Sequence, residues 1–341
     1  MLPRLVAALA AVATASVTGG AAAQAQFSFS DKPLTLPSAF APPGFTGGVY
    51  TTSTGESVRV FSAPAYATDP SFNQRWADFV ASMPHGSEIS TVTIYLASLA
   101  QLGTVCGLHT IGCYSPEDRV IFASGDDVTD RATAQSILAH EYGHHIANSR
   151  RNTPWSAEDY GTKRWATHED VCRKAHDETL FPGDEGEHYK LNSGEVFAES
   201  YRVLVEQKLG LPSSPWLAVA PSLQPDATAL EPLAEDISSP WTGPAVSTRT
   251  GSFRPYTGDA RTIGFTAPLD GVATLRLRAP AGSAYDVRLF DPSGRRLLAE
   301  TKPGARTTKT IRYLVCGDHS FELRVVRTRG FGPFTLQISK P

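Results

Sequence analysis

Two histidines lie four residues apart in an apolar stretch of this chain, and a glutamate directly follows the first: they are His140, Glu141 and His144. Residues four apart lie on one face of an α-helix, so both imidazoles can reach the same point in space. Alanine, isoleucine and leucine surround them, as in a helix with one side buried. The spacing therefore predicts a helix here, with Asp130 as its N-cap and residues 148–149 as its exit.

The same spacing is typical of the His-Glu-x-x-His zinc site, in which two imidazoles bind the ion and the glutamate acts as general base. Glu141 is expected to take a proton from the water that the zinc ion activates. A catalytic zinc site normally has three protein ligands and keeps one position open for water. The sequence therefore predicts one catalytic Zn²⁺ bound by His140, His144 and a third residue elsewhere in the chain.

The third ligand is not a histidine six residues beyond the second, because that position is Arg150. A later predicted helix, residues 193–209, has two glutamates on one face, Glu195 and Glu199. Glu195 is the candidate ligand, and Glu199 could accept a hydrogen bond from a ligand imidazole and fix its orientation. The pattern also fits a capping box, in which Glu195 serves only the helix start at Asn192.

Between the two helices lies a polar segment, residues 150–190, that holds further groups able to bind a metal. Most charged side chains in such a segment are solvated, so each of them is a weaker candidate than Glu195. These rival candidates are His168, His176, Glu178, Asp184, Glu187 and His188.

Two histidines with a glutamate on a later helix resemble the ligand set of the gluzincin metallopeptidases. Residues 140–144 and 194–204 also resemble the corresponding helices in the catalytic domain of anthrax lethal factor and its relatives. The resemblance covers about residues 58–209 and implies an α+β zincin-like catalytic domain. It also implies a tyrosine, shortly before the glutamate ligand, that assists the oxyanion. Tyr189 is nearest, one residue closer to the glutamate than in that family, and Tyr201 is the alternative.

The first 25 residues have the pattern of a secretory signal peptide. Arg4 supplies a positive charge, residues 5–17 an apolar run too short to span a membrane, and residues 23–25 a cleavage site near Ala25. We therefore expect a secreted, extracellular protein with no membrane partner. The formal charge of −3 gives no sign of nucleic acid as a partner. A protein or peptide substrate and a monomeric state are expected.

The rest of the chain is longer than one hydrophobic core usually organises, so two domains are expected. Residues 26–55 are expected to form an extended leader or short pro-segment, and residues 56–210 the metallopeptidase domain. Residues 211–244 carry many prolines, which predicts a linker or a packed irregular strap. Short alternating strands in residues 245–341 predict an all-β antiparallel sandwich. Residues 316–336 resemble the pre-peptidase C-terminal domain of secreted bacterial proteases.

Four cysteines in an exported chain suggest two disulfides. Cys106 and Cys113 bracket a short loop that contains glycine, so we pair them. Cys172 and Cys316 remain and lie in different expected domains, which their bond would join. The alternative for this second pair is two free thiols.

A strand is expected at residues 118–124, directly before the motif helix. In zincins the strand in that place is a sheet edge, so an extended substrate could pair with it through backbone hydrogen bonds. Two functions remain open: a secreted zinc endopeptidase, or a secreted binding protein with a structural or vestigial metal site and the sandwich as its working module. Glu141 favours the enzyme, because a structural site needs no general base and usually includes cysteine ligands.

Overall fold

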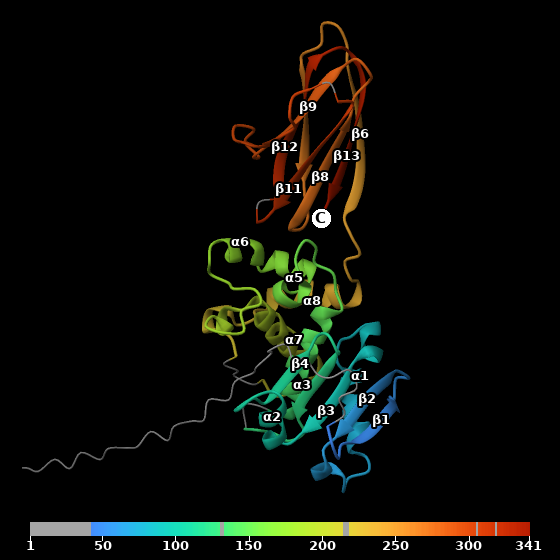
Figure 1. The fold of residues 1–341 in the computed structure, drawn as a ribbon, viewed down its shortest axis with the longest axis vertical. Helices are drawn as coiled ribbons and strands as arrows, with labels where there is room; N and C mark the ends of the chain where they lie inside the picture. Colours follow the sequence, from blue (N-terminus) through green and yellow to red (C-terminus); the bar gives the residue numbers. More distant parts are fainter. Residues whose placement is uncertain (1–41, 130–132, 214–217, 305, 318) are drawn as a thin grey trace, which may run out of the picture.

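The computed structural model describes residues 42–129, 133–213, 218–304, 306–317 and 319–341. The expected signal peptide, residues 26–41 of the expected leader and Asp130 lie outside these residues. The described residues contain helices and β-sheets, with one large hydrophobic core before residue 238 and a second after residue 252. Figure 1 shows the C-terminal β-sheets stacked on one end of the helical part, with the N-terminal sheet at the other end.

The N-terminal part packs helices against one sheet with the strand order β1-β2-β3-β5-β4. Its inner strands run parallel, and the outer strands β1 and β4 are antiparallel to their neighbours. The strands are β1 Thr46–Thr51, β2 Ser57–Ser62, β3 Thr93–Ala97, β4 Gly112–Ser115 and β5 Val120–Ser124. Since β1 pairs along its whole length with β2, this stretch of the expected leader belongs to the sheet instead.

The prediction that the strand at residues 118–124 lies at the edge of the sheet is wrong. β5 lies between β3 and β4, and all of its residues are buried, as is usual for a parallel strand covered on both faces. The outer strand next to the motif helix is β4, which follows the loop of the first cysteine pair and folds back antiparallel onto β5. A strand of only four residues has too little alternation to be read from the sequence.

The helices of this part cover the sheet and then extend beyond it towards the C-terminal sheets. They are α1 Phe72–Ser82, α2 Leu99–Val105, α3 Ala134–Asn148, α4 Ala157–Tyr160, α5 Lys163–His168, α6 Val171–His176, α7 Ser193–Leu209 and α8 Ala227–Ser238. Short 3-10 turns lie at η1 Pro64–Tyr66, η2 Ser87–Thr91, η3 Tyr189–Leu191 and η4 Pro221–Leu223. None of the helices in the described residues is long and apolar enough to cross a membrane.

Helix α8 occupies much of the expected Pro-rich linker. Leu230, Leu233 and Ile237 lie on one helical face and are buried in the N-terminal core. Asp236 is buried as well, and its carboxylate accepts hydrogen bonds from the backbone and guanidinium of Arg164. A helix was not predicted here because proline is unfavourable inside helices, and one proline of this segment, Pro232, lies inside α8.

Helices α3 and α7 pack directly on each other. α3 is capped by Thr133, whose side chain accepts a hydrogen bond from the backbone N–H of Ser136. A Cβ at Gly143 would lie 2.8 Å from the Cα of Ala198, so only glycine allows this approach of the two helices. α7 has the predicted bounds and ends at Gly210, which adopts the left-handed conformation common after a helix.

The C-terminal part consists of two four-stranded antiparallel sheets that enclose the second core. Their strand orders are β10-β9-β12-β7 and β11-β8-β13-β6. The strands are β6 Ala245–Phe253, β7 Ala260–Thr266, β8 Gly271–Arg278, β9 Ala284–Phe290, β10 Leu297–Glu300, β11 Thr308–Val315, β12 Ser320–Arg329 and β13 Gly332–Lys340. These antiparallel sheets agree with the short alternating strands expected in residues 245–341. The outer strands β6, β7 and β10 are largely exposed, so they carry little apolar alternation.

A disulfide between Cys172 of α6 and Cys316, just after β11, joins the two parts. The first pair, Cys106 and Cys113, is also bonded, which leaves none of the cysteines free. Close to the joining disulfide, the backbone N–H of Asp270 donates to the hydroxyl of Thr167. Two disulfides fit an oxidising, extracellular environment.

Replacing both Cys172 and Cys316 with serine is expected to lower the free energy of unfolding by about 4 kcal/mol, because the bond closes a very long loop in the unfolded chain. Urea denaturation of the parent and the double variant, followed by circular dichroism, measures this difference. Equal unfolding midpoints would show that contacts such as that of Asp270 hold the junction without the disulfide.

Candidate metal centre

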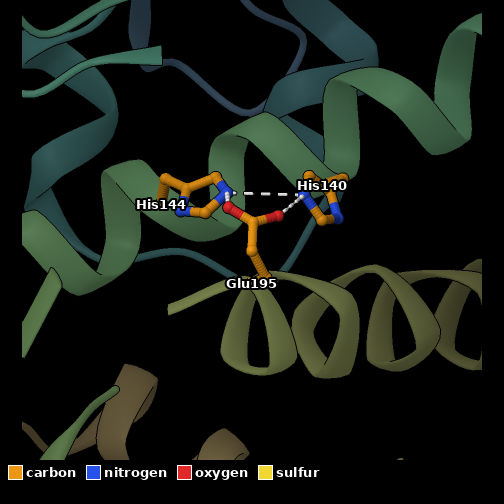
Figure 2. A group of neighbouring side chains, drawn as sticks. All are labelled: His140, His144 and Glu195. Carbon is orange, nitrogen blue, oxygen red and sulfur yellow. Dashed lines mark hydrogen bonds and ion pairs between the residues drawn. The ribbon is translucent and has the colours of Figure 1, made fainter. Parts of the chain in front are cut away.

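Three side chains from α3 and α7 point at one another in the interior of the N-terminal part (Figure 2). The Nε2 atoms of His140 and His144 are 3.4 Å apart. Glu195, in the first turn of α7, places Oε2 at 3.3 Å from Nε2 of His140 and Oε1 at 3.6 Å from Nε2 of His144. The helical spacing of the histidines and the close packing of α7 together produce this convergence.

The arrangement fits a single tetrahedral cation. In a tetrahedral site with bonds of about 2.0–2.1 Å, neighbouring donor atoms are about 3.3–3.4 Å apart. The distances between the donor atoms of His140, His144 and Glu195 are close to this value. All three side chains are buried, and no other group of this kind occurs among the described residues. The centre can therefore bind one divalent metal ion.

Glu199 lies on the far side of the first histidine, with Oε2 at 3.5 Å from Nδ1 of His140. Arg202 donates to both oxygens of this carboxylate, at 3.0 Å from Nε and 2.5 Å from Nη2. Burial alone would raise the pKa of Glu199, but the hydrogen bonds with His140 and Arg202 outweigh it and lower the pKa. Glu199 is therefore ionised and can orient the imidazole of His140.

The network continues back to α3. Arg202 also pairs with Glu206, whose Oε1 accepts a hydrogen bond from Ser136 Oγ at 3.0 Å. These residues are almost fully buried, so the charges are weakly screened. A chain of polar contacts thus links the start of α3 to the face of α7 that carries the metal centre.

Glu141 is fully buried between α3 and the outer strand β4. A Cβ at Gly112 of β4 would lie 2.5 Å from Oε1 of Glu141 and 3.0 Å from a methyl carbon of Ile137. Glycine therefore leaves the space that the carboxylate occupies. Gly112 was not identified from the sequence, because its strand was not predicted and a lone glycine gives no signal.

The structure distinguishes the two candidate tyrosines. Tyr189, in η3, donates a hydrogen bond of 2.7 Å from its hydroxyl to Oε2 of Glu195 and is partly exposed. Tyr201 is fully buried, and its hydroxyl donates to the carbonyl of Pro84. Tyr189 therefore lies at the metal centre, and Tyr201 is part of the core.

Helix α7 is capped by Asn192, whose Oδ1 accepts from the backbone N–H of Gly194 at 3.0 Å. The side chain of Glu195 is directed at the histidines, as required of a ligand. None of the rival candidates belongs to the cluster of three. Asp184 instead accepts from His188 at 2.9 Å, a hydrogen bond that lowers the pKa of Asp184. The remaining rivals are exposed: His168, His176, Glu178 and Glu187.

Comparisons with known proteins return only partial structural similarities. No family model matches the chain, and a search of curated proteins finds no match. Solved structures similar to parts of it include the pre-peptidase C-terminal domain of collagenase from Bacillus anthracis, with 14% identity, 27% of this chain and 87% of that chain covered, and a TM-score of 0.25. The Clostridium perfringens CspB protease has 11% identity, with 27% and 25% covered and a TM-score of 0.21. With TM-scores this low, neither likeness supports a functional conclusion.

Proposed function

We propose that the protein is a secreted zinc-dependent endopeptidase, a hydrolase that cleaves peptide bonds. The proposal rests on the buried convergence of His140, His144 and Glu195. Glu141 is buried as well and lies on α3, the helix that carries both histidines. Two imidazoles and one carboxylate suit zinc, and three protein ligands leave a position for water. A structural zinc site usually has four protein ligands, often cysteines, but all cysteines of this chain are in disulfides.

When bound, zinc supplies Lewis acidity and lowers the pKa of a coordinated water towards neutrality. Glu141 accepts the proton of the attacking water and delivers it to the leaving amine. Glu199 holds the proton of His140 on Nδ1, so that Nε2 keeps its lone pair for the metal. Tyr189, whose hydroxyl donates to Glu195 in this structure, would donate instead to the oxyanion of the substrate during the reaction.

In this proposal the catalytic domain is zincin-like and includes β1 and α8, so that it spans about residues 46–238, and residues 245–341 form a pre-peptidase C-terminal-like module. β4 is the outer strand at this end of the sheet, but all four of its residues are buried, so the observed sheet does not support backbone pairing of a substrate with it. Gly112 of β4 lies against Glu141 and leaves the space that this carboxylate occupies.

Removal of the metal tests the proposal. Mature protein treated with a strong chelator is expected to lose all cleavage of a fluorogenic peptide library, and one equivalent of Zn²⁺ is expected to restore it. Magnesium, which prefers oxygen ligands, serves as the control cation. Undiminished cleavage by zinc-free protein would overturn the metal-dependent mechanism. A zinc-loaded, folded protein that cleaves no peptide would support the alternative, a binding protein with a structural or vestigial site.

A further inference from the structure

A cavity of about 160 Å³ opens directly beside the metal centre. His144 and Glu195, two of the candidate metal ligands, form part of its wall. A side chain of the substrate that enters this cavity therefore belongs to a residue next to the bond that is cleaved. The residues that line the cavity therefore affect which peptides the enzyme cleaves.

The wall of the cavity is strongly acidic. In addition to Glu195, it carries the carboxylates of Glu158 and Asp159 from α4 and of Glu185 from the loop before η3. Among the described residues that line the cavity there is no lysine or arginine. Partly buried charges are screened less than exposed ones, so the negative potential here persists at physiological salt. Burial also raises the pKa of Asp159, a desolvation cost that a bound cation would reduce.

The acidic groups are held in place by the framework of the metal centre. Asn192, the cap of α7, donates from Nδ2 to Oε1 of Glu185 at 2.7 Å and accepts from the N–H of Gly183 at 3.0 Å. A Cβ at Gly194 would lie 2.7 Å from the carbonyl oxygen of Glu158, so α4 is packed directly on the start of α7. The charges therefore keep a fixed position relative to the ligand Glu195, one residue further on.

We propose that this cavity binds the side chain of the substrate residue next to the scissile bond and selects lysine or arginine there. This inference rests on the proposed peptidase function, which it deepens by naming the substrate class. Favourable charge interactions at Glu158, Asp159 and Glu185 would act on the cationic side chain and would be absent for a neutral one of the same length. Acidic side chains would be repelled.

The test compares three peptides that differ only at one residue flanking the scissile bond: lysine, norleucine or glutamate. The zinc-loaded enzyme is expected to cleave the lysine peptide with a kcat/KM about tenfold or more above that of norleucine, and the glutamate peptide more slowly still. The preference should shrink as salt is raised. The comparison is made once with the varied residue before the scissile bond and once with it after the bond. Equal rates for lysine and norleucine in both positions would overturn the inference. Failure to cleave any peptide would instead count against the proposed function.

Two variants test which carboxylates determine the preference for lysine. In the double variant Glu158→Gln with Glu185→Gln, the ratio of the lysine to the norleucine rate is expected to fall about tenfold. Glu187→Gln removes an exposed charge from the same loop and is expected to keep the parental ratio. A double variant with the parental ratio would show that these carboxylates do not select the substrate.

A binding measurement keeps the inference testable if the double variant fails to fold. Zinc-loaded Glu141→Gln, which retains every acidic group of the cavity, is titrated with the lysine and norleucine peptides in a calorimeter. The lysine peptide is expected to bind about tenfold more tightly. Equal Kd values would contradict the selection of a cationic side chain.

Discussion

Glu141→Gln is expected to keep its zinc and to lose peptide cleavage by a factor of about a thousand or more. General base catalysis contributes about a hundredfold to ten-thousandfold, and the amide cannot accept the proton of the attacking water. Glutamine has nearly the same shape as glutamate, so it fits the space beside Gly112 without disturbing the fold. Steady-state kcat/KM on a fluorogenic peptide, with zinc content measured on the same sample, provides the test.

The matched control for this variant is Glu178→Gln, which changes the same chemical group at an exposed position away from the metal centre. It is expected to cleave at the parental rate. If Glu141→Gln cleaved as fast as the parent while zinc stayed bound, the carboxylate would have no part in proton transfer.

Glu195→Ala is expected to weaken zinc binding by at least about a hundredfold, since even residues beyond the direct ligands cost ten- to a hundredfold when changed. The substitution removes a fully buried metal ligand and leaves His140 and His144 as the remaining protein ligands. It also removes the acceptor of the Tyr189 hydroxyl. Competition with a chromophoric chelator gives the zinc Kd, and elemental analysis after dialysis gives the retained metal.

Glu178→Ala serves as the control for loss of an exposed glutamate, with an unchanged Kd expected. Parental affinity in Glu195→Ala would mean that another group completes the metal site. Circular dichroism of the metal-free variants shows whether the helices persist, which separates loss of a ligand from loss of fold.

Much of the metal centre could be predicted from the sequence because its signals are local. The spacing of His140 and His144 defines a helical face, and the cap and apolar pattern of residues 193–209 give the second helix with its correct bounds. One glutamate, Glu195, then lies at the start of that helix, where close packing on α3 brings it to the histidines. Gly143, which permits that packing, was also visible as a glycine inside a predicted helix.

Features that depend on the pairing of distant segments could not be predicted in the same way. The identity of the sheet edge depends on where the short strand β4 docks, and its four residues carry no periodicity. The acidic cavity combines carboxylates of Glu158 and Glu185 from two segments of a region whose charges resembled ordinary solvated ones. The same polar segment contains the short helices α5 and α6, which Asp170, in the left-handed conformation, separates.

The most direct test of the account is X-ray absorption at the zinc edge of the purified parent protein, together with its zinc stoichiometry. We expect one zinc per chain, with only nitrogen and oxygen neighbours at about 2.0–2.2 Å and two imidazoles among them. His140→Ala should change this spectrum or abolish binding. A protein without zinc affinity, or a zinc ion with sulfur neighbours at about 2.3 Å, would contradict the metal centre described for His140, His144 and Glu195.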